Sequence, residues 1–213
     1  MFALAAKPDC RKRGGPLLIN YRTSHQFRIQ ADRLLGTEVA DVDGNVETRN
    51  GTVSVFDGPA PSIRVFADEA KEIAGVGAWL GEVCRGDVQA GEIAVFVRSV
   101  DQLERARQAV AAAGLDFCAL DEHVRPEEGR VSICTMHLAK GLEFRVVVVM
   151  ACDDEVIPLQ KRIQDISDNA DLQEIYNTER HLLYVACTRA RDQLLVTATE
   201  PASEFLGDLT KKL

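Results

Sequence analysis

Short runs of consecutive apolar residues recur along the sequence and constrain its fold more than any other feature. The clearest run is 146–151, and similar runs lie at 92–97 and 131–135. The segments between them carry apolar residues at helical spacing, such as Ile73, Val76, Leu80 and Val83 after Asp68. Apolar strands that alternate with such helices are typical of a mostly parallel sheet covered by helices on both faces. The sequence therefore predicts an α/β fold.

The same patterns predict the order of elements along the chain. We expect strands at 16–19, 52–56, 62–66, 92–97, 117–120, 131–135, 145–151 and 193–197. We expect helices that begin at Thr23 or Ser24, at Asp68 and at Ser99 or Asp101, and two more at 172–186 and 202–213. The polar segments 121–130 and 153–171 are expected to be irregular.

Composition narrows the class of protein. At 213 residues, with 46% hydrophobic and 27% charged residues, the chain is an ordinary soluble protein of one large or two small domains. No apolar run is long enough to span a bilayer, and the apolar residues 1–6 lack a preceding basic segment, so we expect a cytoplasmic protein. The six cysteines form no CxxC pair, which argues against a metal site and against disulfides.

The formal charge of −8 argues against a broad basic surface that grips nucleic acid, although a narrow track of a few arginines stays compatible with it. Lys7, Arg11, Lys12 and Arg13 form one basic cluster before the first expected strand. We interpret residues 1–15 as a flexible basic tail.

The segment from Thr135 to Phe144 combines a hydroxyl, an imidazole, an ammonium, a glycine and a carboxylate between two apolar strands. Loops at strand ends are where open α/β sheets bind ligands. Gly141 permits a positive φ or a close backbone approach, and Glu143 can accept hydrogen bonds from sugar hydroxyls. Thr135 and His137 can donate to the phosphates of a polynucleotide. Taken singly, His137 also fits a loop histidine bonded to backbone, but ten such residues together favour a binding site.

Two further segments stand out. In 20–23, Tyr21 can stack on a purine and Arg22 can bind phosphate, although a turn with a partly buried tyrosine and a surface arginine is the better interpretation of this segment taken alone. In 179–190, Arg189 follows a helix with a buried apolar face. An arginine there can reach toward a γ-phosphate, or simply complement the dipole at the end of the helix.

In order and spacing, these three segments resemble motifs IV, V and VI of the UvrD/Rep/PcrA family of superfamily 1 DNA helicases, and the resemblance extends over about residues 16–200. It implies a second RecA-like motor domain at 16–213, with ATP bound between it and an N-terminal RecA-like domain. By this resemblance Tyr21 lies near the adenine, Arg22 and Arg189 reach the γ-phosphate, and Gly141 and Glu143 belong to the nucleotide site, with Glu143 on the ribose.

The resemblance also implies a path for single-stranded DNA. Thr135 and His137 correspond to family residues along the strand, and Arg98 corresponds to a family arginine that contacts the DNA backbone. The large insertion that the family carries before motif V is missing here, or reduced to the loop 121–130.

The sequence departs from a complete motor because it has no G-x-x-x-x-G-K-[ST] phosphate loop. The run 146–150 followed by Asp153 imitates a Walker B strand, but it follows motif V, where the family has a plain core strand. We therefore expect the missing first domain to hold Mg²⁺ and the chain alone to be inactive as an ATPase. Either it is the C-terminal part of a longer helicase or it is a natural half-motor. The alternative function is a non-catalytic module that binds nucleic acid or a repair partner.

Overall fold

The computed structural model describes residues 31–34, 59–121, 123, 125–164 and 169–210, together with four short strands nearer the N-terminus. These strands are β1 (Ile19–Asn20), β2 (Glu38–Ala40), β3 (Val46–Thr48) and β4 (Val53–Ser54). β1 pairs with β4 in parallel, and β2 pairs with β3 antiparallel. The predicted tail 1–15 and the predicted site residues Tyr21 and Arg22 lie outside the described residues.

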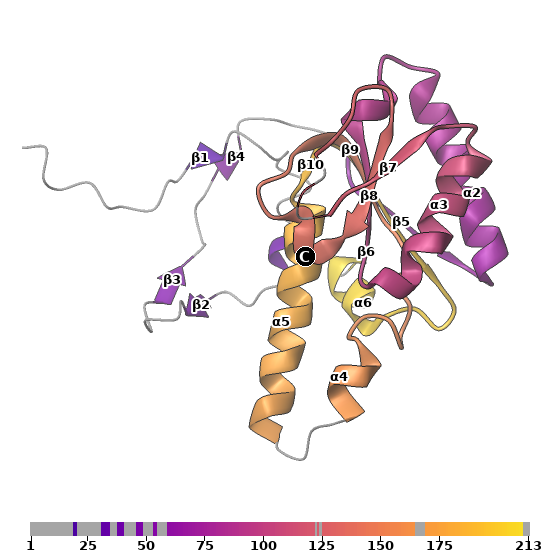
Figure 1. Ribbon diagram of the computed structural model, residues 1–213. Coiled ribbons are helices and arrows are strands. Elements are labelled where there is room, and N and C mark those ends of the chain that lie inside the picture. The colour runs from indigo at the N-terminus through magenta and orange to yellow at the C-terminus, as the bar shows by residue number, and fades with distance from the viewer. Residues whose placement is uncertain are drawn as a thin grey trace, which may run out of the picture.

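A six-stranded parallel sheet forms the centre of the molecule (Figure 1). Its strands are β5 (Ser62–Phe66), β6 (Ile93–Val97), β7 (Phe117–Ala119), β8 (Val131–Thr135), β9 (Phe144–Val149) and β10 (Ala190–Thr199). They lie in the order β5-β10-β9-β6-β8-β7, and every neighbouring pair is parallel. The predicted parallel α/β fold is thereby confirmed.

In the described part of the chain, the helices around the sheet are α2 (Glu69–Cys84), α3 (Leu103–Ala112), α4 (Gln160–Gln164), α5 (Asn169–Cys187) and α6 (Glu204–Thr210). Two 3₁₀ turns, η1 (Ala90–Glu92) and η2 (Val100–Gln102), lie between helices and strands, and a third, η3 (Met136–Ala139), lies between β8 and β9. The helix predicted after Asp68 is confirmed, and the Asp68 carboxylate caps it by accepting from the Lys71 backbone N–H at 2.8 Å. None of the helices in the described part of the chain is long and apolar enough to cross a membrane.

Successive strand residues point to opposite sides of the sheet. Because apolar residues occupy both sides, helices cover both faces. On β6, Ile93, Val95 and Val97 pack against the side covered by α2 and α3. Ala94 and Phe96 pack against the side covered by α5 and α6. All five are fully buried, which explains why this strand is wholly apolar rather than alternating.

The structure corrects one expectation about the polar segment 153–171. It was expected to be irregular, but it contains α4 and the start of α5 at Asn169. The α4 sequence QKRIQ has a single apolar residue, so it carries no hydrophobic periodicity. Its Arg162 side chain binds Glu179 of α5 at 3.1 Å, a tertiary contact that the local sequence does not reveal.

Two glycines of α2 give opposite predictions for stability. A Cβ added at Gly77 would lie 2.8 Å from the Ala112 Cβ of α3, whereas one added at Gly81 would meet nothing within 4 Å. We expect Gly77→Ala to lower the free energy of unfolding by about 1–2 kcal/mol, because the two helices must separate. Gly81→Ala should raise it by about 0.5–1 kcal/mol through helix propensity alone. Urea denaturation measures both, and a shift of the same sign in the two variants would contradict this packing.

Candidate nucleotide and nucleic-acid site

The segment between β8 and β9 runs back across the face of the sheet. It begins at the edge formed by the carboxyl ends of the strands (the carboxyl edge) and ends at the edge formed by their amino ends (the amino edge). β8 and β9 are both parallel to β6, which lies between them, so the chain leaves β8 at the carboxyl edge and enters β9 at the amino edge. Met136 and Ala139 of η3 are buried in the core on the α5 side, which fixes the crossing against the sheet. One short segment therefore brings residues to two opposite edges.

Gly141 makes the turn in this crossing. Its φ is +85°, in the left-handed region that favours glycine, while a Cβ at this position would have open space around it. Of the two roles expected for Gly141, the structure supports the positive φ. Within the described residues, no neighbour approaches it closely.

The carboxyl edge collects the three residues predicted to lie along a nucleic-acid strand. Thr135 ends β8 and is half-buried, and His137 on η3 is exposed. Arg98 follows β6, whose last residue pairs with Thr135. The surrounding protein and the charge of Arg98 lower the pKa of His137, so this imidazole is neutral at pH 7. The predicted group is brought together in space, although its contact with DNA stays a prediction.

Arg98 has a structural partner that the sequence does not suggest. It is 2% exposed, and its Nε and one terminal nitrogen donate to both carboxylate oxygens of Glu179, which is fully buried on α5. Glu179 also accepts from Arg162 at 3.1 Å and from the Leu159 backbone N–H at 3.4 Å. Burial opposes the charged form of Glu179, but the hydrogen bonds and charge of Arg98 outweigh it and lower its pKa. In this arrangement the Arg98 guanidinium is committed to Glu179.

The amino edge collects the residues predicted to serve the nucleotide. Glu143 is exposed just before β9, and Arg189 lies just before β10, where its backbone carbonyl accepts from the Phe144 N–H at 3.0 Å. The Arg189 side chain donates to the carbonyls of Val185 at 3.1 Å and Leu142 at 3.4 Å. Arg189 thus lies beside Glu143, and it also caps the carboxyl end of α5 as the simpler interpretation anticipated.

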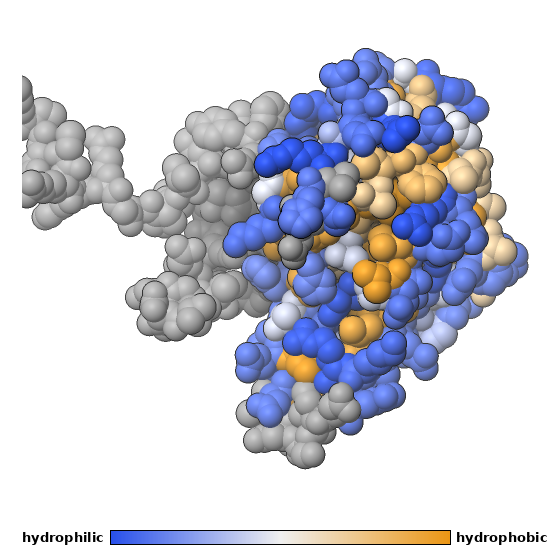
Figure 2. Space-filling view, viewed as in Figure 1, coloured by the Kyte–Doolittle hydropathy of each residue, from blue (hydrophilic) through white to orange (hydrophobic). Residues whose placement is uncertain are grey.

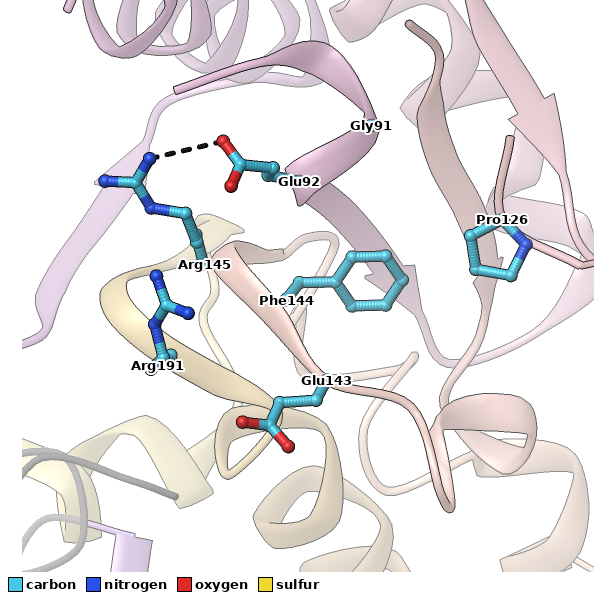
Figure 3. Close-up of a pocket in the computed structure, with 7 residues that line it drawn as sticks. All are labelled: Gly91, Glu92, Pro126, Glu143, Phe144, Arg145 and Arg191. Carbon is cyan, nitrogen blue, oxygen red and sulfur yellow. Dashed lines mark hydrogen bonds and ion pairs between the residues drawn. The ribbon is translucent and has the colours of Figure 1, made fainter. Parts of the chain in front are cut away.

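A pocket of about 330 Å³ opens at the amino edge, with Glu143 in its wall (Figure 3). It is lined by Gly91, Glu92, Pro126, Glu143, Phe144, Arg145 and Arg191. Figure 3 shows the Phe144 ring directed toward Pro126, while the Arg145 side chain points toward Glu92. The pocket offers an acceptor carboxylate together with an apolar wall.

The two pocket arginines were not predicted from the sequence. Arg145 binds the carboxylates of Asp87 at 3.0 Å, Glu92 at 3.2 Å and Asp192 at 2.9 Å, and Arg191 binds Asp192 at 2.8 Å. The hydrogen bonds that Arg145 donates to Asp192 and Asp87 raise its pKa. A charged residue inside an otherwise apolar strand was the available signal. Since both arginines are already paired, they offer little spare positive charge, and Arg145 links the start of β9 to Asp87, Glu92 and Asp192.

Asp153, which imitates a Walker B carboxylate, is occupied by structural contacts. It accepts from Arg105 at 2.6 Å and from the Thr199 backbone N–H at 2.6 Å. Arg105 in turn pairs with Glu72, which is fully buried. Among the described residues, no group of three or more His, Cys, Asp or Glu is arranged to hold a metal ion. This geometry supports a structural role for Asp153.

These features define a class: a RecA-like α/β domain with candidate binding segments at two edges of one parallel sheet. Residues 118–201 match the model of the UvrD-like helicase C-terminal domain family. This part of the chain, which includes both 135–144 and 179–190, is similar to the C-terminal domain of UvrD-like helicases.

Curated relatives agree over the same part of the chain. The ATP-dependent DNA helicase Rep of Buchnera aphidicola (strain APS) is 38% identical over 77 residues, which is 36% of this chain and 11% of that protein. The ATP-dependent DNA helicase PcrA of Staphylococcus aureus (strain Mu50) is 40% identical over 70 residues, which is 33% of this chain and 9% of that protein. The chain thus matches about a tenth of the length of these relatives.

One solved structure resembles the whole fold. The C-terminal domain of a possible DNA helicase from Lactobacillus plantarum WCFS1 superposes with a TM-score of 0.59 at 20% identity, covering 89% of this chain and 94% of that one. At this identity the likeness concerns the fold, and it agrees with the RecA-like architecture.

Removing the Glu179 charge should be costly. Glu179→Gln leaves Arg98 buried beside a neutral amide, and loss of one partner of a buried ion pair costs about 3–5 kcal/mol. We expect the free energy of unfolding, measured by urea denaturation at pH 7, to fall by that amount. Glu104→Gln is the matched control: Glu104 pairs with Arg107 at 3.3 Å on an exposed helix surface, so about 0.5 kcal/mol or less is expected.

The cost of Glu179→Gln should depend on pH. The folded protein lowers the pKa of Glu179 from its ordinary value of 4.5, so its carboxylate stabilises the fold above that value and loses this effect as pH falls below it. The difference in unfolding free energy between wild type and Glu179→Gln should therefore shrink below pH 4.5. A constant difference from pH 7 to pH 3 would show that the variant acts through packing instead.

Proposed function

We propose that this chain is the second motor half of an ATP-dependent DNA helicase or translocase, with a nucleotide at the amino edge of its sheet and single-stranded DNA at the carboxyl edge. The observation that carries the proposal is the crossing segment 135–144, which begins at Thr135 and His137 on one edge and ends at Glu143 on the other. Such a segment connects the two ligands mechanically. The relatives, both ATP-dependent DNA helicases by name, support this reading.

The chemistry of the amino edge fits the sugar and phosphates of ATP in different places. The exposed Glu143 carboxylate suits the ribose hydroxyls, which are hydrogen-bond donors. The pocket arginines are already paired with carboxylates. The phosphates would therefore be bound by Arg189 and Arg22, which both belong to this chain. Tyr21 would stack near the adenine and Gly141 would allow the turn that sets Glu143.

ATP bound there with Mg²⁺ would supply a γ-phosphoryl group for transfer to water. Arg189 would stabilise negative charge on that group as it departs, the role of an arginine supplied across a domain interface. Since the described residues offer no cluster of metal ligands, Mg²⁺ would be held by a first domain that carries the phosphate loop. That domain is the expected protein partner.

The carboxyl edge would bind the strand through phosphate contacts. Thr135 and His137 present hydroxyl and imidazole donors there, and neither adds charge at pH 7. With a net charge of −8, the chain should bind single strands weakly and only at low salt. Arg98 would reach a backbone only by leaving Glu179.

An ATPase measurement tests the proposal. We expect the chain alone, with single-stranded DNA present, to hydrolyse ATP far more slowly than about 1 s⁻¹, because it has no phosphate loop. In a protein that joins it to a phosphate-loop domain, Arg189→Ala should lower turnover by about 10³-fold or more while DNA affinity changes by less than about twofold. Arg107→Ala, an arginine of similar size paired with Glu104 on α3, is the control and should keep wild-type turnover.

Two results would contradict this function. Sustained turnover by the chain alone would mean that it holds a complete active site. Wild-type turnover in the joined Arg189→Ala protein would contradict the proposed role of Arg189 at the γ-phosphate. It would favour the non-catalytic binding module instead.

A further inference from the structure

The cluster around Glu179 contains two positive charges and one negative charge, so one positive charge is not balanced within it. Two guanidinium groups, those of Arg98 and Arg162, share this single carboxylate. Arg98 is buried and occupies both carboxylate oxygens, so its charge is matched inside the protein. Arg162 makes one contact at 3.1 Å, and its side chain is 40% exposed. The surplus charge therefore reaches solvent at Arg162.

This charge lies at the carboxyl edge of the sheet. Arg162 shares the Glu179 carboxylate with Arg98, which directly follows β6, and its charge is felt at His137. Figure 1 shows α4 beside α5, where α5 projects past the sheet, and Figure 2 shows mostly hydrophilic residues over this part of the surface. Arg162 is thus next to the proposed strand path but belongs to none of the three motif segments.

The neighbouring lysine offers a contrast. Lys161 is 82% exposed and lies 3.6 Å from the Asp101 carboxylate, so its charge has an acidic partner of its own. Arg162, in contrast, contacts the Glu179 carboxylate, whose charge is already neutralised by Arg98. Anchoring lowers the entropy lost on binding, and a planar fork suits the two free oxygens of a phosphodiester.

We infer that Arg162 binds a backbone phosphate of the single strand, as a contact point outside the recognised motif segments, with Glu179 as its positioning residue. The inference rests on the proposed function, since it assumes a strand at this edge. It adds a solvent-facing cation to an edge where Thr135 and His137 are uncharged at pH 7 and the charge of Arg98 is committed to Glu179. It also explains how a chain of charge −8 provides a local site for a polyanion.

The test is binding of a fluorescein-labelled oligothymidylate of about 16 nucleotides to the full chain, followed by anisotropy at several salt concentrations from about 50 mM. Arg162→Gln should weaken binding about tenfold. It should also reduce the slope of log affinity against log salt by about 0.7, the value for one phosphate contact with a single strand. Arg162→Lys should keep the slope while losing part of the affinity, because the charge stays and the fork is lost.

Arg130→Gln is the matched control. Arg130 is 51% exposed, pairs with Glu127 at 3.0 Å and lies before β8 at the opposite edge, so its loss should leave affinity and slope unchanged. Urea denaturation of each variant checks that the fold is kept, as the Arg98–Glu179 pair remains in Arg162→Gln. Equal affinities for Arg162→Gln and Arg130→Gln would overturn the inference alone. No binding by the wild-type chain at low salt would overturn the inference and also the proposed strand path at this edge.

Discussion

The parallel pairing of β8, β6 and β9 is the constraint on which the rest of the structure depends. Parallel strands cannot be joined by a tight turn, so the chain must return across the sheet between β8 and β9. Here the return is a 3₁₀ turn and a glycine with φ of +85°, not a long helix. The side chains before the return lie at one edge and those after it at the other. A nucleotide bound at one edge and a nucleic acid bound at the other would touch opposite ends of the same short, well-packed segment.

Helix α5 runs beside this segment and connects the same two edges. Its Glu179 lies in the buried cluster with Arg98 at the carboxyl edge, and Arg189 lies two residues beyond its end, Cys187, at the amino edge. The eight helical steps from Glu179 to Cys187 rise about 12 Å, which is comparable with the length of a four-residue strand. Buried ion pairs of this kind contribute little net stability, but they define the position of the helix, because losing one partner is costly. The proposed coupling thus has two parallel connections, η3 with its glycine and α5.

How much of this could be predicted depends on the range of the interaction. Local patterns were sufficient for most of the sheet and for α2 and α3, because burial on both faces leaves a continuous apolar run in a central strand such as β6. The roles of the crossing-segment residues stay predictions. Helix α4 was missed because its sequence is polar and its contact is with Glu179, beyond its own turn. The pairing of Arg98 with Glu179 joins residues 81 positions apart, and nothing in either local sequence indicates it. Charged residues inside apolar runs, such as Arg145, marked contacts but not their partners.

The central claim is that the two ends of the crossing segment serve different ligands. Amide chemical shifts of the isotope-labelled chain, followed by NMR during titration with oligothymidylate at low salt, test it most directly. The account predicts that shifts concentrate at the carboxyl edge, on Arg98, Thr135 and His137, while Glu143 and Arg189 move little. Shifts centred on Glu143 and Arg189, with the carboxyl edge unchanged, would contradict it.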